Sequence, residues 1–213
     1  MKRLIWGLAA GILLLIVCST LRLERGLSPE FKLFYDQHKV IMEYKVPHYI
    51  DQKKPEERSY FLKLPPDKQR QYIKLFWEIR EIGMEEEYKI RLGVVKKWFR
   101  FEGIDPWHTD LGRTMLLCGQ PFDEQYRDQN GNPYNEGEEL WNEARQAGKR
   151  WFRHWLYWHG QGFFQQVITI TFEWDGLRWR YMQSADTLIQ RFVEYWKFRM
   201  APTDEGWELW GKQ

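Results

Sequence analysis

The sequence predicts an α+β domain that follows an N-terminal membrane-anchor helix. Three observations lead to this prediction. The chain begins with an apolar run long enough to cross a bilayer. Apolar side chains then recur at helical spacing over several segments, after which the pattern changes to the alternation of a small antiparallel sheet. A C-terminal helical pattern follows, and helices, strands and helix in this order are typical of an α+β fold.

The first residues have the features of a transmembrane anchor or signal segment. An apolar run extends from Leu4 to Leu21, with polar residues only near its end. Its eighteen residues would rise about 27 Å as a helix, close to the thickness of the bilayer hydrocarbon. Lys2 and Arg3 precede the run, and such basic residues favour a cytoplasmic start. The length and the basic start disfavour a buried core helix, so we expect residues 4–21 to contact the membrane.

Three fates of this segment stay open: retention as an anchor, cleavage by signal peptidase, and acylation at Cys18. For cleavage, only Val17-x-Ser19 approximates the usual pair of small residues. The tetrad Leu15-Ile16-Val17-Cys18 resembles a lipoprotein box, although Val17 stands where a small residue is expected. We expect retention first and lipidation at Cys18 second.

Composition indicates a packed globular domain after the anchor. We assign 1–25 to the anchor and 26–213 to a single domain, because about 190 residues suit one hydrophobic core. Hydrophobic residues make up 43% and aromatic residues 17% of the chain, which is unlike a disordered sequence. Tryptophan is unusually frequent, with 13 residues.

Charge and cysteine content exclude several classes of function. Without Lys2 and Arg3 the chain has 30 basic and 30 acidic residues, a balance of zero, and so lacks the basic surface of nucleic-acid-binding proteins. Cys18 lies in the apolar run, which leaves Cys118 alone in the domain. We therefore expect neither an intramolecular disulfide nor a cysteine-rich metal site, and no cofactor is predicted.

Four helical patterns precede the sheet. We expect helices over 29–44, 55–64, 67–80 and 84–101. Prolines and acidic residues stand at their starts, and basic residues stand near the end of the last one, as the helix dipole favours. Gly83 separates the third helix from the fourth.

Extended patterns follow the helices. A compact apolar strand is expected over Thr114–Cys118, closed by the Gly119-Gln120-Pro121 turn. Further strands are expected over Trp151–Trp158 and Phe164–Glu173. Asp175-Gly176 then turns the chain into a hairpin strand over Leu177–Tyr181.

The C-terminal residues predict a helix and a short amphipathic tail. The helix should begin near Ser184 and bury Leu188, Phe192, Tyr195 and Trp196. The tail, Trp207-Glu208-Leu209-Trp210, has two interpretations. It could dock on a partner or on the membrane interface, or it could fold back onto the domain.

One stretch resembles a known family. Asp105-Pro-Trp-His-Thr-Asp-Leu-Gly-Arg113, followed by an apolar segment and Gly119-Gln120-Pro121, is similar to the defining region of the GWxTD-domain family of bacterial envelope proteins. The likeness covers about Val46 to Met182. It includes three flanking segments, namely Tyr60-Phe61 with Phe76-to-Arg80, Glu139-Leu140-Trp141, and Asp175-Gly176.

The departures from the family pattern identify the chain as a divergent member. Pro106 replaces the first glycine of the motif, Leu111 stands where arginine is usual, and the Asp-Pro segment expected after Arg80 is absent. The resemblance implies a secreted or lipidated envelope protein of a domain type without an assigned reaction. Together with the basic start of the anchor, it places the domain on the periplasmic side of a bacterial cell envelope.

The motif itself predicts a chain reversal. Asp110 could cap its own backbone and pair with Arg113, Gly112 could adopt a positive φ, and Trp107 could act as an apolar anchor. The residues given this structural role are Trp107, Thr109, Asp110, Gly112, Arg113, Gly119 and Pro121. A second interpretation treats His108, Asp110 and Arg113 as a ligand-binding cluster that holds an anion or acts as acid and base.

Other histidines and tryptophans offer weaker candidates. His154 and His159 are five residues apart and should face opposite sides of a strand, which is unsuitable for a metal. Two aromatic sets could stack on sugar rings, fill a protein groove, or simply form the core: Trp151, Trp155 and Tyr157, and Trp174 with Trp179. The sequence contains no recognised catalytic motif, so no catalytic residue is assigned and catalysis stays open.

The favoured function is therefore that of a membrane-tethered interaction or structural subunit of the envelope, with a protein partner. The alternatives are a glycan-binding envelope module and a hydrolase or transferase that uses His108 and Asp110. The identity of the partner and the oligomeric state do not follow from the sequence.

Overall fold

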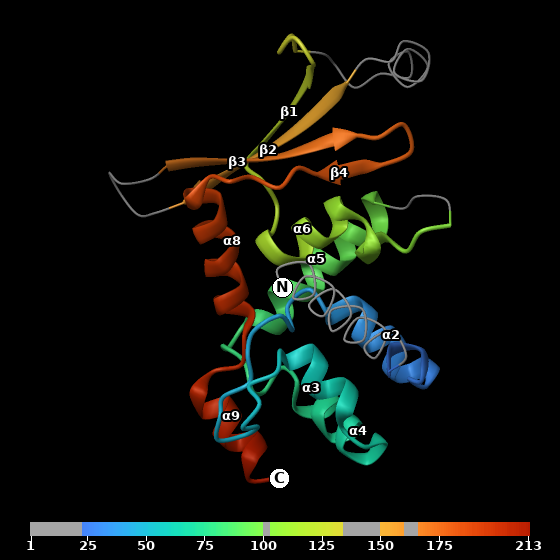
Figure 1. Ribbon diagram of the computed structural model, residues 1–213, viewed down its shortest axis with the longest axis vertical. Coiled ribbons are helices and arrows are strands. Elements are labelled where there is room, and N and C mark those ends of the chain that lie inside the picture. The colour runs from blue at the N-terminus through green and yellow to red at the C-terminus, as the bar shows by residue number, and fades with distance from the viewer. Residues whose placement is uncertain (1–22, 100–102, 134–149, 160–165) are drawn as a thin grey trace, which may run out of the picture. The chain divides into compact units, whose positions relative to one another are not determined.

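The computed structural model describes residues 23–99, 103–133, 150–159 and 166–213, and within them the fold is α+β (Figure 1). The anchor over 4–21 with Cys18, the helix end at Phe101, the segment 139–141 and the strand start at Phe164 lie outside the described residues. None of the described helices combines the length and the apolar character that crossing a bilayer requires.

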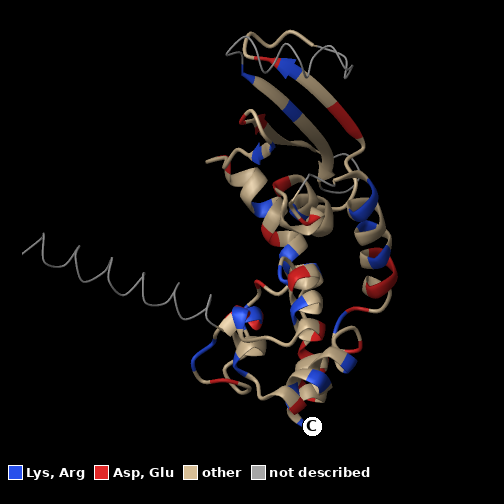
Figure 2. Ribbon diagram, turned by 90° about the vertical axis from the view of Figure 1, so that its right-hand side faces the viewer, with Lys and Arg blue, Asp and Glu red and all other residues tan. Residues whose placement is uncertain are grey.

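The described residues form two compact units. The helical unit comprises 23–82 and 201–213, and the sheet unit comprises the described residues between 83 and 200. Basic and acidic residues both occur along the described helices (Figure 2). The expectation of one domain over 26–213 stays a prediction.

Besides the helical residues 23–25, the described part of the helical unit contains four α-helices. They are α2 (Pro29–His38), α3 (Glu57–Lys63), α4 (Pro66–Leu75) and α9 (Asp204–Gly211). Each of the first three begins within two residues of its predicted start. The first and third end earlier than predicted, because the chain after α2 turns into a short bridge between Lys45 and Glu56 and the chain after α4 continues as separate turns.

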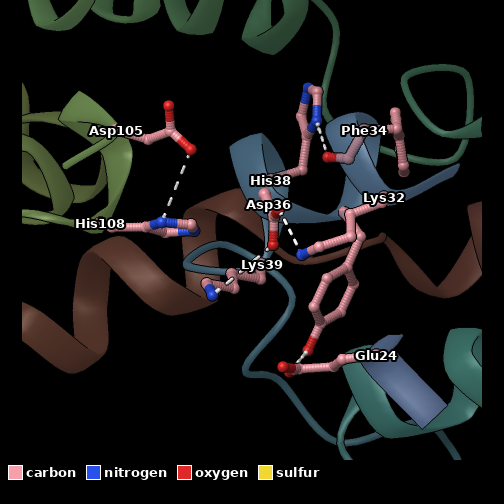
Figure 3. A network of polar contacts seen from close by, with 9 residues as sticks. Glu24, Lys32, Phe34, Asp36, His38, Lys39, Asp105 and His108 are labelled. Atoms are coloured by element: carbon pink, nitrogen blue, oxygen red, sulfur yellow. Dashed lines mark hydrogen bonds and ion pairs between the residues drawn. The ribbon is translucent and has the colours of Figure 1, made fainter. Parts of the chain in front are cut away.

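Ion pairs and a hydrogen bond involve side chains of α2. Lys32 Nζ lies 2.7 Å from Asp36 Oδ2, and Lys39 Nζ lies 3.8 Å from Asp36 Oδ1 (Figure 3). Tyr35 donates a hydrogen bond of 2.6 Å to Glu24 Oε1. Asp36 is buried, but its two lysine partners are partly exposed, and ion pairs with an exposed partner contribute at most about 1 kcal/mol each.

The C-terminal tail folds back onto the helical unit, which decides between its two interpretations. Trp207 and Trp210 of α9 are buried, and Trp210 Nε1 donates a hydrogen bond of 2.9 Å to the Tyr60 hydroxyl. A Cβ at Gly206 would lie 2.0 Å from the carbonyl oxygen of Ile79, so only glycine permits this approach. The tryptophans of the tail therefore belong to the core.

A charged pair lies inside the aromatic core of the helical unit. The side chains of Glu57 and Arg80 are fully buried, and Arg80 Nη2 lies 2.5 Å from Glu57 Oε1. Tyr72 donates a hydrogen bond of 2.5 Å to the same oxygen, and the Arg80 guanidinium lies 3.6 Å from the centre of the Phe76 ring. Burial, together with the Glu57 carboxylate, raises the pKa of Tyr72 well above its usual value. The hydroxyl therefore remains a donor at neutral pH.

The sheet unit places a four-stranded antiparallel sheet against helices. Its helical elements are α5 (Met84–Trp98), the 3₁₀ turn η1 (Pro106–His108), α6 (Asp110–Cys118) and α8 (Thr187–Met200). Its strands pair in the order β1 (Asp123–Asp128), β2 (Trp151–His159), β3 (Gln166–Trp174) and β4 (Trp179–Tyr181). The predicted hairpin through Asp175-Gly176 and the existence of the C-terminal helix are both confirmed. Of the residues that this helix was expected to bury, Phe192 is buried, but Leu188 and Trp196 are half-buried and Tyr195 is 44% exposed.

The strand predicted over Thr114–Cys118 is wrong, because these residues belong to the helix α6. Thr109 caps this helix by accepting a hydrogen bond of 2.9 Å from the Gly112 amide. A short apolar run fits a buried strand and a buried helix equally well, and the cap decides in favour of the helix. The helix ends at Gly119, whose φ is 78°. The strand β1 comes after this turn, in a polar stretch that shows no strand pattern.

Arg91 joins three helices of the sheet unit. Its Nη1 donates hydrogen bonds to the carbonyl oxygens of Leu116 (3.1 Å) and Leu117 (2.5 Å) at the end of α6. Its Nη2 pairs with Glu87, and its guanidinium lies 4.7 Å from the centre of the Trp196 ring in α8. The cation thus satisfies carbonyls that the helix end leaves without partners.

Both aromatic sets that were considered as binding surfaces lie mainly in the core under the sheet. Trp151, Trp155 and Tyr157 of β2 are buried, as is Trp179 of β4, while Trp174 is half-buried. The Trp155 ring lies 5.7 Å from Phe99, and the Tyr157 ring lies 5.2 Å from Phe192 of α8. Tyr157 thus packs on α8, and Trp155 packs beside the end of α5.

We expect the Cys118 thiol to be unreactive in the folded protein. Burial raises its pKa to about 12, so the nucleophilic thiolate is scarce at pH 8. Iodoacetamide should modify Cys118 about 1000-fold more slowly in native protein than in urea, measured by mass spectrometry of its peptide. Because the folded pKa exceeds the unfolded value, the stability from this burial is complete below pH 8 and is lost as pH rises toward 12. Equal rates of modification would contradict the packing of α6.

Candidate interaction surface

The motif residues form a capped chain reversal between η1 and α6. Thr109 Oγ1 donates a hydrogen bond of 2.7 Å to the Pro106 carbonyl oxygen while it accepts from the Gly112 amide. A Cβ at Gly112 would lie 2.0 Å from that same Pro106 oxygen. A glycine is therefore required at position 112 because a larger residue would not fit. The expected positive φ is not the reason, since the backbone of Gly112 is helical. Thr109, and not Asp110 as expected, caps the helix.

Two polar residues of the motif, Asp110 and His108, have different partners. Asp110 Oδ2 accepts a hydrogen bond of 2.9 Å from the Tyr181 amide and so connects α6 to the end of β4. His108 Nδ1 lies 3.9 Å from Asp105 Oδ2 (Figure 3). Arg113 is exposed on α6. One carboxylate oxygen of Asp110 is thus engaged in a backbone contact between α6 and β4.

The remaining motif residues complete the reversal. Trp107 is half-buried, Gly119 is buried and forms the end of α6, and Pro121 is half-buried in the turn that leads to β1. Tyr157 donates a hydrogen bond of 3.1 Å to the Gly119 carbonyl oxygen and so holds this turn against the sheet.

The two histidines of β2 lie on opposite faces of the sheet, as predicted. His154 Nδ1 lies 3.0 Å from Thr171 Oγ1, while the His159 ring lies 5.6 Å from Phe192 on the helix-covered side. In the part of the chain that the structure describes, no three side chains of His, Cys, Asp or Glu are grouped to hold a metal ion.

The sheet has a second face, turned away from α6 and α8 (Figure 1). We call it the outer face. Strand pairing aligns its side chains across three strands, since residues directly opposite one another share a face. The outer face consists of Asp123, Gln125 and Arg127 of β1, Phe152, His154, Leu156 and Trp158 of β2, and Val167, Thr169, Thr171 and Glu173 of β3.

One end of the outer face exposes apolar side chains. We call it the aromatic end, formed by Phe122, Leu156, Trp158 and Val167. The Phe122 and Trp158 rings are stacked, with centroids 4.6 Å apart and planes inclined by 14°. Their exposed fractions are 47% and 54%, and that of Val167 is 45%. An exposed stacked aromatic pair of this kind is characteristic of a binding surface.

The rest of the outer face is mainly polar. Burial, and secondarily Arg127, lowers the pKa of His154, so its ring is neutral at pH 7. Arg150 Nε lies 2.5 Å from Glu173 Oε1, and Arg180 Nε lies 2.7 Å from Asp175 Oδ2. The aromatic end is therefore the apolar and exposed part of a face that is otherwise mainly polar.

Sequence reasoning did not single out this surface, because apolar side chains lie on both faces of β2. The strand reads Trp-Phe-Arg-His-Trp-Leu-Tyr-Trp-His, and simple alternation does not say which set faces the helices. The only available signal was Phe122, an aromatic residue placed between the turn and the polar strand β1.

Comparison with known proteins gives no further guidance: no family model, no curated protein and no solved structure matches the chain. The resemblance to the GWxTD-domain family therefore rests on the sequence alone and stays a prediction.

Proposed function

We propose that the protein is a membrane-tethered interaction subunit of a bacterial cell envelope, which binds a protein partner through the outer face of its sheet. The observation that carries this proposal is the stacked and half-exposed pair of Phe122 and Trp158. Aromatic side chains of this kind contribute most of the binding energy at protein interfaces.

A protein suits this surface better than a sugar does. The aromatic end presents four apolar side chains, and Glu173 at the other end of the outer face is paired with Arg150. Sugar recognition requires polar side chains that hydrogen-bond the hydroxyl groups around a stacking ring. An apolar patch with a polar surround is instead the usual composition of a protein interface.

The proposed membrane anchor indicates where the partner is located. The apolar run ends at Leu21, and the described chain begins in helical conformation at Leu23. Because little chain separates the apolar run from the domain, the protein would be held close to the bilayer surface. Lys2 and Arg3 favour a periplasmic position. We therefore propose a partner that is itself in or on the same membrane, as the resemblance to an envelope family also suggests.

We expect Trp158→Ser to release the partner. The test is gentle detergent extraction of the full-length protein from its native membrane, followed by quantitative mass spectrometry of co-purified proteins. Loss of one buried aromatic anchor at an interface weakens binding by about 2 kcal/mol or more, so recovery of the partner should fall at least tenfold.

The matched control is Trp98→Ser on α5, where the side chain is 67% exposed. This variant should retain the partner at the wild-type level. Equal recovery of the partner from both variants would exclude the outer face as the binding surface.

A different result would support a glycan-binding module. In that case the protein would sediment with peptidoglycan, this binding would depend on Trp158, and no partner protein would be retained. The mass of the extracted N-terminus tests the tether, since a chain cleaved after the apolar run would contradict it.

A further inference from the structure

The strand β3 has a free edge next to the outer face. The strand β4 pairs with β3 only from Phe172 to Trp174, and the last contact is a hydrogen bond of 2.9 Å from the Met182 amide to the Thr171 carbonyl oxygen. The chain then leaves for α8. In the described part of the chain, no strand continues β4 alongside residues 166–170 of β3.

The backbone groups at this edge point outward. In an antiparallel ladder, alternate residues direct their N–H and C=O groups to the same neighbouring strand. Thr171 bonds toward β4, so Thr169 and Val167 direct their backbone groups to the same side, beyond the end of β4. Ile168 and Ile170 direct theirs to β2. Two outward residues therefore offer up to two donors and two acceptors at the spacing of an extended chain.

The edge lacks the usual protection against pairing. Native edge strands carry charged residues, prolines or bulges that prevent another strand from adding. Residues 166–170 read Gln-Val-Ile-Thr-Ile, with no charge and no proline, and they pair with β2 in continuous register. An unprotected edge of this composition is suited to bind an added strand.

A pocket lies beside the same edge. It has a volume of about 220 Å³ and is lined by apolar and uncharged polar side chains. The apolar part of the lining includes Ile170, Met182 and Ile189. The uncharged polar part includes Thr169, Gln183 and Ser184. With no charged residue in its lining, the pocket favours one uncharged, mainly apolar side chain.

We propose that the free edge of β3 and this pocket bind an extended peptide segment of the protein partner. The segment pairs with Val167 and Thr169 as an additional strand and places one uncharged apolar side chain in the pocket. Regularly spaced backbone donors and acceptors recognise a peptide backbone, whereas the pocket supplies side-chain specificity. Thr169 and Thr171 belong both to the pocket and to the outer face, so the two contacts form one continuous surface. This inference rests on the proposed function.

Hydrogen exchange of individual amides tests strand addition directly. In the extracted full-length protein without partner, we expect the Val167 and Thr169 amides to exchange at least about tenfold faster than those of Ile168 and Ile170. In the native extract that retains the partner, Val167 and Thr169 should slow at least about tenfold. Unchanged exchange in the complex would overturn the strand-addition proposal.

Two variants test the same contacts by partner recovery. Thr169→Pro removes an outward N–H at an edge position that tolerates proline, and Gln183→Trp fills the pocket. Each should lower recovery of the partner at least about tenfold. Leu177→Trp, which adds the same ring at a 69% exposed turn position, should retain it. An unchanged melting temperature shows that each variant is folded. If Thr169→Pro does not fold, partner recovery by Gln183→Trp alone tests the proposal.

The outcomes separate this inference from the proposed function. If Trp158→Ser loses the partner but Thr169→Pro and Gln183→Trp keep it, the peptide site is wrong and the outer face stands. If wild-type protein retains no partner, both proposals fail. If the amides of Val167 and Thr169 are protected in a homodimer, the occupant is a second copy of this chain and the partner peptide is excluded.

Discussion

Replacing Arg80 by methionine should lower the free energy of unfolding of the helical unit by about 3–5 kcal/mol. Glu57 and Arg80 are fully buried and lie 2.5 Å apart, so the variant leaves a carboxylate in the core without its cation. One oxygen of this carboxylate, Oε2, is buried and accepts no hydrogen bond from the described residues. Urea titration of the full-length protein, followed by deuterium uptake of peptides covering 57–80, measures the change.

The adjacent exposed pair provides a matched control. Arg58 Nε lies 2.6 Å from Glu56 Oε2, but both side chains are more than one third exposed. Arg58→Met should therefore lower the free energy of unfolding by less than about 1 kcal/mol. The double variant Glu57→Leu with Arg80→Met should recover at least half of the loss, since it removes both charges together. An effect of Arg80→Met no larger than that of Arg58→Met would show that the buried pair does not hold the core.

Replacing Gly112 by alanine should destabilise the sheet unit by about 3–5 kcal/mol. The added Cβ would lie 2.0 Å from the Pro106 carbonyl oxygen and 2.9 Å from Thr109 Oγ1. Both contacts involve the turn that starts α6, so relief requires the capped reversal to open. Deuterium uptake of peptides covering 105–118 in a urea titration measures this.

Gly93→Ala is the control for that substitution. Gly93 lies in an exposed turn of α5, and its added Cβ would meet nothing within 4 Å. Alanine should stabilise this helix by about 0.5–1 kcal/mol, because glycine loses more backbone entropy on folding. If both glycine variants behaved alike, the motif would lack the tight turn assigned to it.

The sequence was informative where a pattern is local. The helices α2, α3, α4, α5 and α8 follow from apolar spacing and terminal residues, and the β3–β4 hairpin follows from Asp175-Gly176. The assignment of α6 failed because five consecutive apolar or small residues carry no period, and only the Thr109 cap distinguishes a helix. The polar strand β1 has no pattern of its own and exists through its pairing with β2.

The candidate surface could not be derived from the sequence because it depends on contacts between distant residues. Phe122 and Trp158 stack although they are 36 residues apart in the chain. The other face of β2 is covered because its rings contact Phe99 and Phe192, which belong to separate elements. The same holds for Glu57 and Arg80, which are 23 residues apart in the chain. Local periodicity predicts which residues are apolar but not which apolar face stays exposed.

The most direct test of the proposed interaction surface is photo-crosslinking in the native membrane. A photoreactive benzoylphenylalanine is placed at Trp158, and in a parallel culture at the exposed control position Trp98. We predict one discrete covalent product from position 158, containing this chain and a membrane-associated protein, and none from position 98. No product from position 158, or the same product from both positions, would contradict a partner bound at the outer face.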